Sequence, residues 1–462
     1  MPQDSFGLEI SAANDQAVSA YNELVNAYLG FRRDTGEHLK TALAADAGLI
    51  MGHVLKGYFY LLFCSPQMEG RVAKTIDLAQ AAANAVGASE RERLHIDALR
   101  AWTVRDIAGA TALWEEILLA WPRDIIALRL AHFTHFYMGD SRNLRDSVAR
   151  VMPAWDEVEP GYPYLLGMWA FGLEECGDYA RAEAAGRRAV AMDPANIWSV
   201  HAVAHVMEMQ GRQREGIEWL TETEPAWADR NNFAYHVWWH RALFHLERGE
   251  HDAALGLYDQ KFRADNDSED YLDMSNAIAM LWRLENVGVD IGTRWSELGE
   301  KAEKRLEDHI FVFIDAHLAM ALAASGREQS AARLIETMSA AAASDTTEAP
   351  IYREVGIPLC EALLAYRAGD YGRAVDRLLP IRYDVVRIGG SHAQRDVFQQ
   401  TLIEAALNAK RYPLARALLA ERVAERAGSA YSWGRYADSL DGVGDAEAAA
   451  QARARSAQLF SG

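Results

Sequence analysis

One short turn recurs along this chain and constrains its fold more than any other feature. A glycine ends one helical pattern and polar residues open the next, as in "ECGDYARAE" around Gly177. Glycine accepts the left-handed backbone that a tight helix–turn–helix connection requires. Consecutive full turns are mostly 34 residues (Gly177 to Gly211) to 43 residues (Gly326 to Gly369) apart, slightly long for repeats of two helices. The glycines that mark the turn are Gly139, Gly177, Gly211, Gly249, Gly326, Gly369 and Gly444, with weaker instances at Gly288 and, without glycine, at Lys410.

The residues around the turn are those of a tetratricopeptide repeat. After Gly177, the small residues Ala182 and Ala189 allow two helices to approach closely, and Pro194 ends the second helix. Alternating β-branched runs are nearly absent. We therefore predict an all-α fold, a right-handed superhelical solenoid of about nine or ten tetratricopeptide-type helix pairs, whose concave groove is lined by the first helix of each pair.

The solenoid is predicted to span residues 1–462. Its N-terminal repeats occupy residues 1–110, the central repeats 111–340, and the C-terminal repeats 345–462.

Composition limits the partners and the compartment. The chain has 47 basic and 66 acidic residues and a net charge of −19, which argues against a nucleic-acid partner. Its three cysteines are widely separated and suggest neither a disulfide framework nor a metal motif. The N-terminus lacks the features of a signal peptide, and no apolar run approaches the ~18 residues of a membrane span. We expect a cytoplasmic protein with no membrane partner.

Six longer segments are more specific than a repeat consensus. They are "WSVHAVAHVMEM" (198–209), "YHVWWHRALFHLERGEHDAAL" (235–255), "DHIFVFIDAHLAMA" (308–321), "EVGIPLCEAL" (354–363), "LLPIRY" (378–383) and "GGSHAQRDVFQQTLIEAAL" (389–407). On these segments the chain resembles the tetratricopeptide repeat protein 38 family over most of its length. The resemblance implies the repeat fold and implies that these segments belong together, but it implies no particular activity.

Two of these segments each contain two histidines four residues apart. His201 and His205 form one pair and His236 and His240 the other, and residues at this spacing share one helix face. Glu208 extends the first pair by three residues along the same face. Because each pair lies shortly before a turn glycine, both belong to first helices. We expect the two pairs to meet within about 8 Å on neighbouring helices.

These five residues have three interpretations. Imidazoles and a carboxylate are ligands for Zn²⁺ or Fe²⁺. Neutral histidines are also general bases near pH 7, so the same residues are candidates for acid–base catalysis. The third interpretation is a buried polar layer in which the histidines bond to their neighbours and fix the repeat register. The spacing lacks the HExxH order of metalloproteases.

Other residues are candidates for binding a substrate. On the second helix, Tyr235, Trp238 and Trp239 are either core or the walls of a pocket. Asp315 and His317 are candidates for the same groove, because His317 precedes Gly326 by the nine residues that separate His240 from Gly249. In "GGSHAQRDVF", Ser391 is predicted to cap a helix, and Arg395 is a candidate carboxylate ligand or part of an Arg–Asp clamp. The substrate-binding candidates of this segment are His392, Gln394, Arg395 and Asp396.

The concentration of histidines favours a pocket that binds a small molecule or a metal ion. An enzyme that uses metal-assisted or histidine acid–base chemistry is an alternative, and so is a scaffold that binds an extended peptide in the groove. A homo-oligomer is compatible with the sequence.

Overall fold

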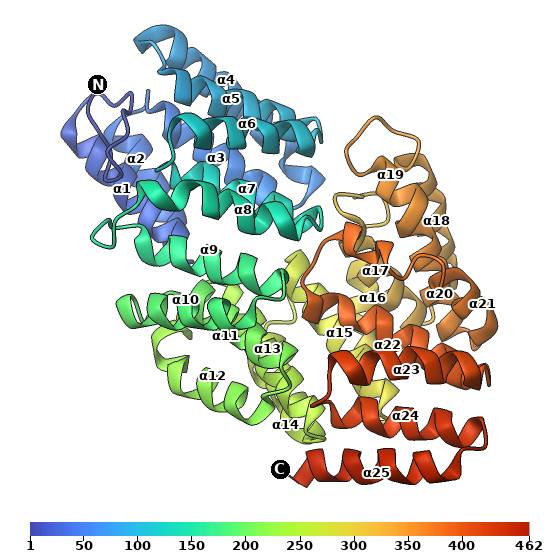
Figure 1. The fold of residues 1–462 in the computed structure, drawn as a ribbon. Coiled ribbons are helices and arrows are strands. Elements are labelled where there is room, and N and C mark those ends of the chain that lie inside the picture. The colour runs from blue at the N-terminus through green and yellow to red at the C-terminus, as the bar shows by residue number, and fades with distance from the viewer. Residues whose placement is uncertain (462) are drawn as a thin grey trace. The chain divides into compact units, whose positions relative to one another are not determined.

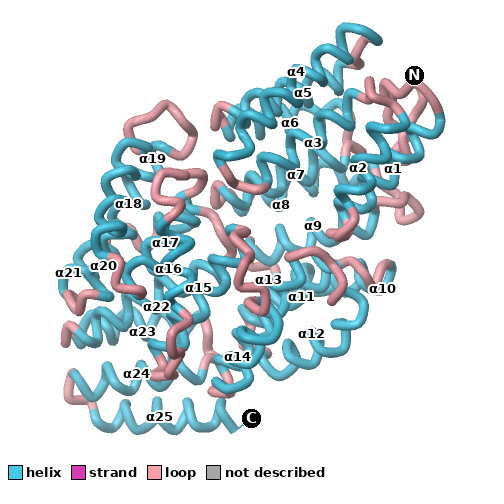
Figure 2. Tube along the Cα trace, turned by 180° about the vertical axis from the view of Figure 1, so that it is seen from behind, coloured by secondary structure: helices cyan, strands magenta, loops and turns pink. Residues whose placement is uncertain are grey.

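The described part of the chain folds into helices joined by turns and loops. The computed structural model describes residues 1–461, and within them there is no strand beyond one isolated bridge between Gln3 and Glu9. The all-α prediction is confirmed, and Figure 2 shows helices and loops throughout. No helix in this described part is long and apolar enough to cross a membrane.

The predicted turns connect the helices. All seven turn glycines have positive φ, for example +79° at Gly177 and +69° at Gly211. Gly288 has φ of +83°, and Lys410 adopts +57° without the freedom of glycine. A side chain with a Cβ rarely adopts this conformation, so the backbone strongly favours glycine at the recurrent turns.

The helices group into two compact units. The first unit contains residues 1–203, 223–234 and 345–348, and the second contains residues 204–222, 235–344 and 349–462. The boundary falls inside helices α11 (Ile197–Met209), α12 (Gln213–Trp227) and α13 (Phe233–Glu247), which each continue from one unit into the other.

The first unit is a series of helix hairpins in which each helix packs on the next along the chain. Its core contains the fully buried Trp114, which packs edge-on against Tyr58 and Trp102. Its other helices are α1 (Asp15–Leu29), α2 (Thr35–Ala45), α3 (Ile50–Leu62), α4 (Glu69–Val86), α5 (Glu90–Thr103), α6 (Ile107–Ala120), α7 (Ile125–Tyr137), α8 (Ser141–Val151), α9 (Tyr162–Glu175) and α10 (Tyr179–Met192), with 3-10 turns η1 (Pro66–Met68) and η2 (Met152–Ala154).

The second unit repeats this arrangement, and Figure 1 shows α22 to α25 stacked as successive hairpins. Helix α15 packs against α17 and α22 and is almost completely buried. The remaining helices are α14 (His251–Leu257), α15 (Tyr271–Asn286), α16 (Trp295–Glu303), α17 (Val312–Ala324), α18 (Glu328–Ala341), α19 (Ala349–Ile351), α20 (Ile357–Arg367), α21 (Tyr371–Leu378), α22 (His392–Asn408), α23 (Tyr412–Glu425), α24 (Ala430–Gly442) and α25 (Ala446–Ser461), with π turns η3 (Tyr258–Phe262) and η4 (Tyr352–Gly356) and the 3-10 turn η5 (Asp384–Ile388).

Candidate functional site

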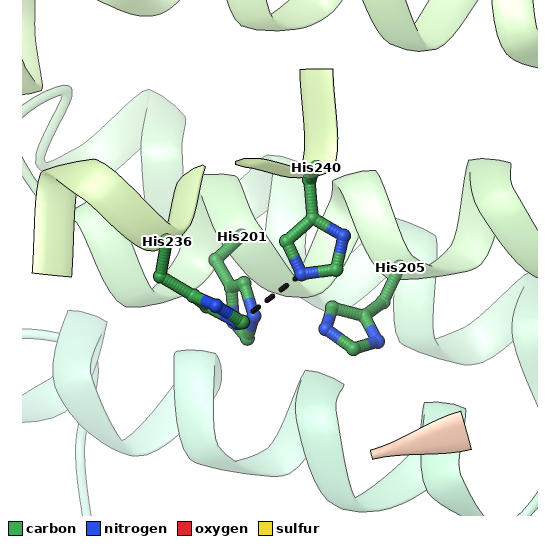
Figure 3. Close-up of side chains that lie close together, drawn as sticks. All are labelled: His201, His205, His236 and His240. Carbon is green, nitrogen blue, oxygen red and sulfur yellow. Dashed lines mark hydrogen bonds between the residues drawn. The ribbon is translucent and has the colours of Figure 1, made fainter. Parts of the chain in front are cut away.

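The four histidines of the two pairs form one buried cluster. Helix α11 carries His201 and His205, and helix α13 carries His236 and His240. One ligand nitrogen from each of the four rings lies within 4.8 Å of the others. Figure 3 shows the four side chains close together. We call these four residues the histidine cluster. His205, His236 and His240 belong to the second unit, and α11 carries His201 one turn before His205.

The distances within the cluster are short. The ring centroids of His205 and His240 are 4.4 Å apart. The Nε2 atoms of His240 and His236 lie 3.2 Å apart and point toward one another (Figure 3). The prediction that the two pairs meet in space is confirmed.

Two polar residues bind the outer nitrogens of the α13 rings. The Oδ1 atom of Asn276, on α15, lies 3.1 Å from the Nδ1 atom of His236. The Oε2 atom of Glu208 lies 2.9 Å from the Nδ1 atom of His240. In metal sites, the histidine nitrogen that faces away from the metal commonly donates a hydrogen bond to such an oxygen. This hydrogen bond fixes the orientation of the ring and its tautomer.

These partners fix where the protons can be. With its amide oxygen assigned toward His236, Asn276 accepts a hydrogen bond, so His236 carries its proton on Nδ1 and has a lone pair on Nε2. If Glu208 is ionised, His240 also donates from Nδ1, and two lone pairs then face each other across 3.2 Å. If Glu208 is protonated, it donates to Nδ1, and the Nε2–H of His240 can donate to His236. The gap between the two Nε2 atoms therefore holds either one proton or one cation.

Burial keeps the imidazoles of His205, His236 and His240 neutral. It lowers the pKa of His205 and of His236 well below the ordinary value, and neighbouring histidines add to the effect. The pKa of His240 falls to about 3 for the same reason, with a smaller contribution from Arg283. Burial raises the pKa of Glu208 to about 7. These three rings are thus in the form that binds metals, and the carboxyl group of Glu208 beside them has a pKa near neutral pH.

Of the three aromatic candidates on α13, Trp239 borders the cluster. Its fully buried ring stacks on His236 at 5.3 Å and meets His240 edge-on at 4.9 Å. Trp238 instead stacks with Tyr235 at 6.1 Å and lies under the ammonium group of Lys261. Trp239 is therefore a wall of the cluster, whereas the other two rings pack with each other.

Asp315 and His317 lie in a separate hydrogen-bond network on α17. Asp315 accepts hydrogen bonds from the hydroxyl of Tyr352 at 2.6 Å and from Nδ1 of His309 at 3.1 Å. His317 donates from Nδ1 to the carbonyl of Phe313 at 2.8 Å. The equal spacing from the turn glycine does not bring His317 into the cluster.

The residues after Gly390 make several contacts within the chain. Ser391 caps α22 as predicted, and Gln394 completes a capping box with it. Arg395 donates a hydrogen bond to the backbone carbonyl of Gly390, just before the same helix. The partner of Asp396 is Arg422, at 2.6 and 2.9 Å, so the clamp predicted for Arg395 is made by another arginine. His392, the first residue of α22, is not a member of the histidine cluster.

Sequence reasoning missed two residues of α15, Asn276 and Arg283. They stand seven residues apart in "SNAIAMLWRLEN", so two full turns place them on one face of the helix. Both are buried. Two polar side chains seven residues apart, with mostly apolar residues between them, are a signal that the sequence does contain.

Comparison with known proteins gives distant similarity only. No family model matches the chain, so the resemblance to the tetratricopeptide repeat protein 38 family stays a prediction. Among solved structures, the chain is similar to an IFIT1 monomeric mutant with Gppp-AAAA, at 14% identity and a TM-score of 0.40 over 97% of this chain and 96% of that one. It is also similar to the human IFIT1 dimer with PPP-AAAA, at 14% identity and a TM-score of 0.38 over 99% and 97%. A chain of Naa15/Naa10 bound to HypK-THB matches at 11% identity and a TM-score of 0.27 over 96% and 70%.

Proposed function

We propose that this protein binds a divalent transition-metal ion in the histidine cluster. The observation that carries the proposal is the pair of Nε2 atoms of His236 and His240, 3.2 Å apart, on rings whose Nδ1 atoms are bound to oxygens. Two nitrogens on a tetrahedral zinc ion, with bonds of 2.0–2.1 Å, are separated by about 3.3–3.4 Å. The spacing of the two rings is close to that of a coordinated pair.

The number of histidines favours a metal over a buried polar layer. A hydrogen bond between His236 and His240 would need only those two rings. Here His201 and His205 also have a ligand nitrogen within 4.8 Å of both. Four buried imidazoles that converge on one point form a ligand set for Zn²⁺ or Fe²⁺.

Glu208 supports the metal without being a ligand in this proposal. Its Oε2 atom accepts a hydrogen bond from His240 when the carboxylate is ionised, and Asn276 does the same for His236. These two oxygens orient the rings and increase the basicity of the nitrogens that face the metal.

The coordination number decides between a structural and a catalytic role. Four imidazoles fill a tetrahedral ion and leave no position for a substrate, whereas a five- or six-coordinate ion keeps an open position. Substitution with Co²⁺ distinguishes these cases, because the intensity of its visible absorption bands depends on coordination number. A four-coordinate spectrum would argue for a structural ion, and a weaker five- or six-coordinate spectrum would favour metal-assisted catalysis.

Elemental analysis of the purified full chain tests the proposal. We expect about one zinc or iron ion per chain, and we expect the double change His201→Ala with His205→Ala to abolish binding, because it removes two ligands from one helix. A metal-free wild type that takes up neither Zn²⁺ nor Fe²⁺ would contradict the proposal.

The matched control is His132→Ala with His135→Ala on α7. These two histidines are also buried and also share a helix face, but they are not part of the cluster. The control should lower the thermal midpoint and leave the metal content unchanged.

A further inference from the structure

Arg129, on helix α7, is a buried cation in the first unit. Only 3% of it is exposed. Burial lowers the pKa of its guanidinium group to about 10, so this group still carries its charge at neutral pH. A buried charge normally needs a paired counter-ion, because its removal from water is costly.

No carboxylate in the described part of the chain pairs with Arg129. The groups that raise its pKa are the phenols of Tyr28 and Tyr137, and neither is a counter-ion at neutral pH. Arg91, in the same unit, is equally buried, but its Nη1 atom lies 2.8 Å from a carboxylate oxygen of Asp124. The charge of Arg129 thus lacks the kind of partner that Arg91 has.

Aromatic rings cover the guanidinium group of Arg129. Its central carbon lies 4.1 Å from the ring centroid of Phe133, 4.3 Å from that of Trp198 and 4.8 Å from that of Phe31. A guanidinium group makes such cation–π contacts through its faces, and they offset part of the cost of burial. Its N–H bonds lie in the plane of the group, so these rings provide no hydrogen-bond acceptor for them.

The unpaired nitrogens of Arg129 lie on one edge of the guanidinium group. Its Nε and Nη2 atoms are buried and have no hydrogen-bond partner in the described part of the chain. These two atoms carry the parallel N–H bonds with which an arginine binds both oxygens of a carboxylate. The buried hydroxyl of Tyr28 and the indole Nε1 of Trp198 also lack a partner in this part of the chain. Buried donors without acceptors therefore gather at Arg129.

We propose that Arg129 binds the carboxylate group of a small monocarboxylate through its Nε and Nη2 atoms. One carboxylate supplies two acceptor oxygens and the single negative charge that would balance the guanidinium group. A chloride ion supplies the charge without the two acceptors, and a phosphate dianion would leave a net negative charge in the interior. Arg129 is not a member of the histidine cluster, and its binding of a carboxylate requires no metal.

Phe31 is the ring whose movement would admit the ligand. Phe133 and Trp198 are held on helices α7 and α11, whereas Phe31 lies in the turn between α1 and α2. Phe31 is half-buried and has a φ of +54°, which a residue other than glycine rarely adopts. A shift of this turn would uncover Arg129 without the unfolding of a helix.

Thermal denaturation of the full chain at pH 7, in sodium acetate and in sodium chloride at equal ionic strength, tests the site. We expect acetate to raise the thermal midpoint of the wild type saturably and more than chloride does, because a ligand that binds only the folded protein stabilises it. Arg129→Lys keeps the charge but loses the two parallel N–H bonds, so the Kd for acetate derived from the midpoints should rise about tenfold or more. Arg129→Gln should lose the difference between acetate and chloride, and Arg129→Lys decides the question if Arg129→Gln does not fold.

Phe31→Ala tests the entry of the ligand. This change removes the ring on the turn, so less of the binding energy is spent on opening the site and the Kd for acetate should fall. Weaker acetate binding to Phe31→Ala would contradict a site that opens at this turn.

Arg91→Lys is the matched control. Arg91 is as deeply buried as Arg129, but Asp124 is already its counter-ion, so the Kd for acetate should stay within about twofold of the wild-type value. Equal effects of acetate and chloride on the wild type would overturn the proposal, as would an unchanged Kd for acetate in Arg129→Lys.

Discussion

At the scale of single residues, Glu208 is the carboxyl group that contacts the histidine cluster. Its Oε2 atom lies 2.9 Å from the Nδ1 atom of His240. Its carboxyl group has a pKa of about 7, whereas burial lowers the pKa of His205, His236 and His240 well below that pH. Glu208 is therefore a group beside the cluster whose protonation changes around pH 7.

This titration predicts a pH dependence of metal binding. Below pH 7, Glu208 keeps a proton in the metal-free protein, and metal binding has to expel it so that His240 can donate from Nδ1. The affinity for Zn²⁺ should therefore fall about tenfold for each pH unit below 7 and change little just above it. Competition titrations with a chromophoric chelator between pH 5 and 8 measure the slope.

Glu208→Gln is the control for this prediction. The amide oxygen still accepts a hydrogen bond from His240 but cannot titrate, so the slope should vanish and the affinity should drop about 10- to 100-fold. If the variant keeps the wild-type slope of Zn²⁺ affinity against pH, a group other than Glu208 is responsible for the pH dependence.

At the scale of helices, the features that could be predicted from the sequence are those that depend on local backbone conformation. The turn glycines were identifiable because their positive φ excludes most other residues, and the histidine pairs because a spacing of four is one helix turn. The partners of those residues were not identifiable. Asn276 and Arg422 reach His236 and Asp396 from helices 40 and 26 residues away, and no periodicity specifies such contacts.

The small residues on α10 give a prediction about helix packing. A Cβ atom on Gly186 would lie 2.6 Å from the Cγ2 atom of Val203, and Val203 is a rigid, buried neighbour. Gly186→Ala should lower the free energy of unfolding by about 1–3 kcal/mol, because α10 must move. Gly70→Ala is the control, since a Cβ there meets nothing within 4 Å and alanine is the better helix former. Urea denaturation of both variants measures the difference, and equal stability would argue against close packing at Gly186.

At the scale of the whole molecule, the chain has two compact units, and His205, His236 and His240 lie in the second. Each unit buries its own large aromatic residues, for example Trp114 in the first and Trp282 in the second. A ligand bound at the histidine cluster stabilises only those conformations in which the helices that carry the cluster are folded. The stabilisation by the ligand should therefore be confined to these helices and their neighbours.

Hydrogen exchange tests this locality. Zinc at a free concentration of 100 times its Kd should stabilise the folded cluster by about 2.7 kcal/mol, which slows the exchange of amides that open only when the cluster opens by about 100-fold. The slower amides should lie in α11, α13 and α15, because these helices carry the four histidines and Asn276. Amides of α5 and α6, around Trp114, should exchange at the same rate with zinc as with chelator. Uniform slowing along the chain would mean that the two units unfold as one, and no slowing in α11 or α13 would mean that zinc does not bind at the histidines.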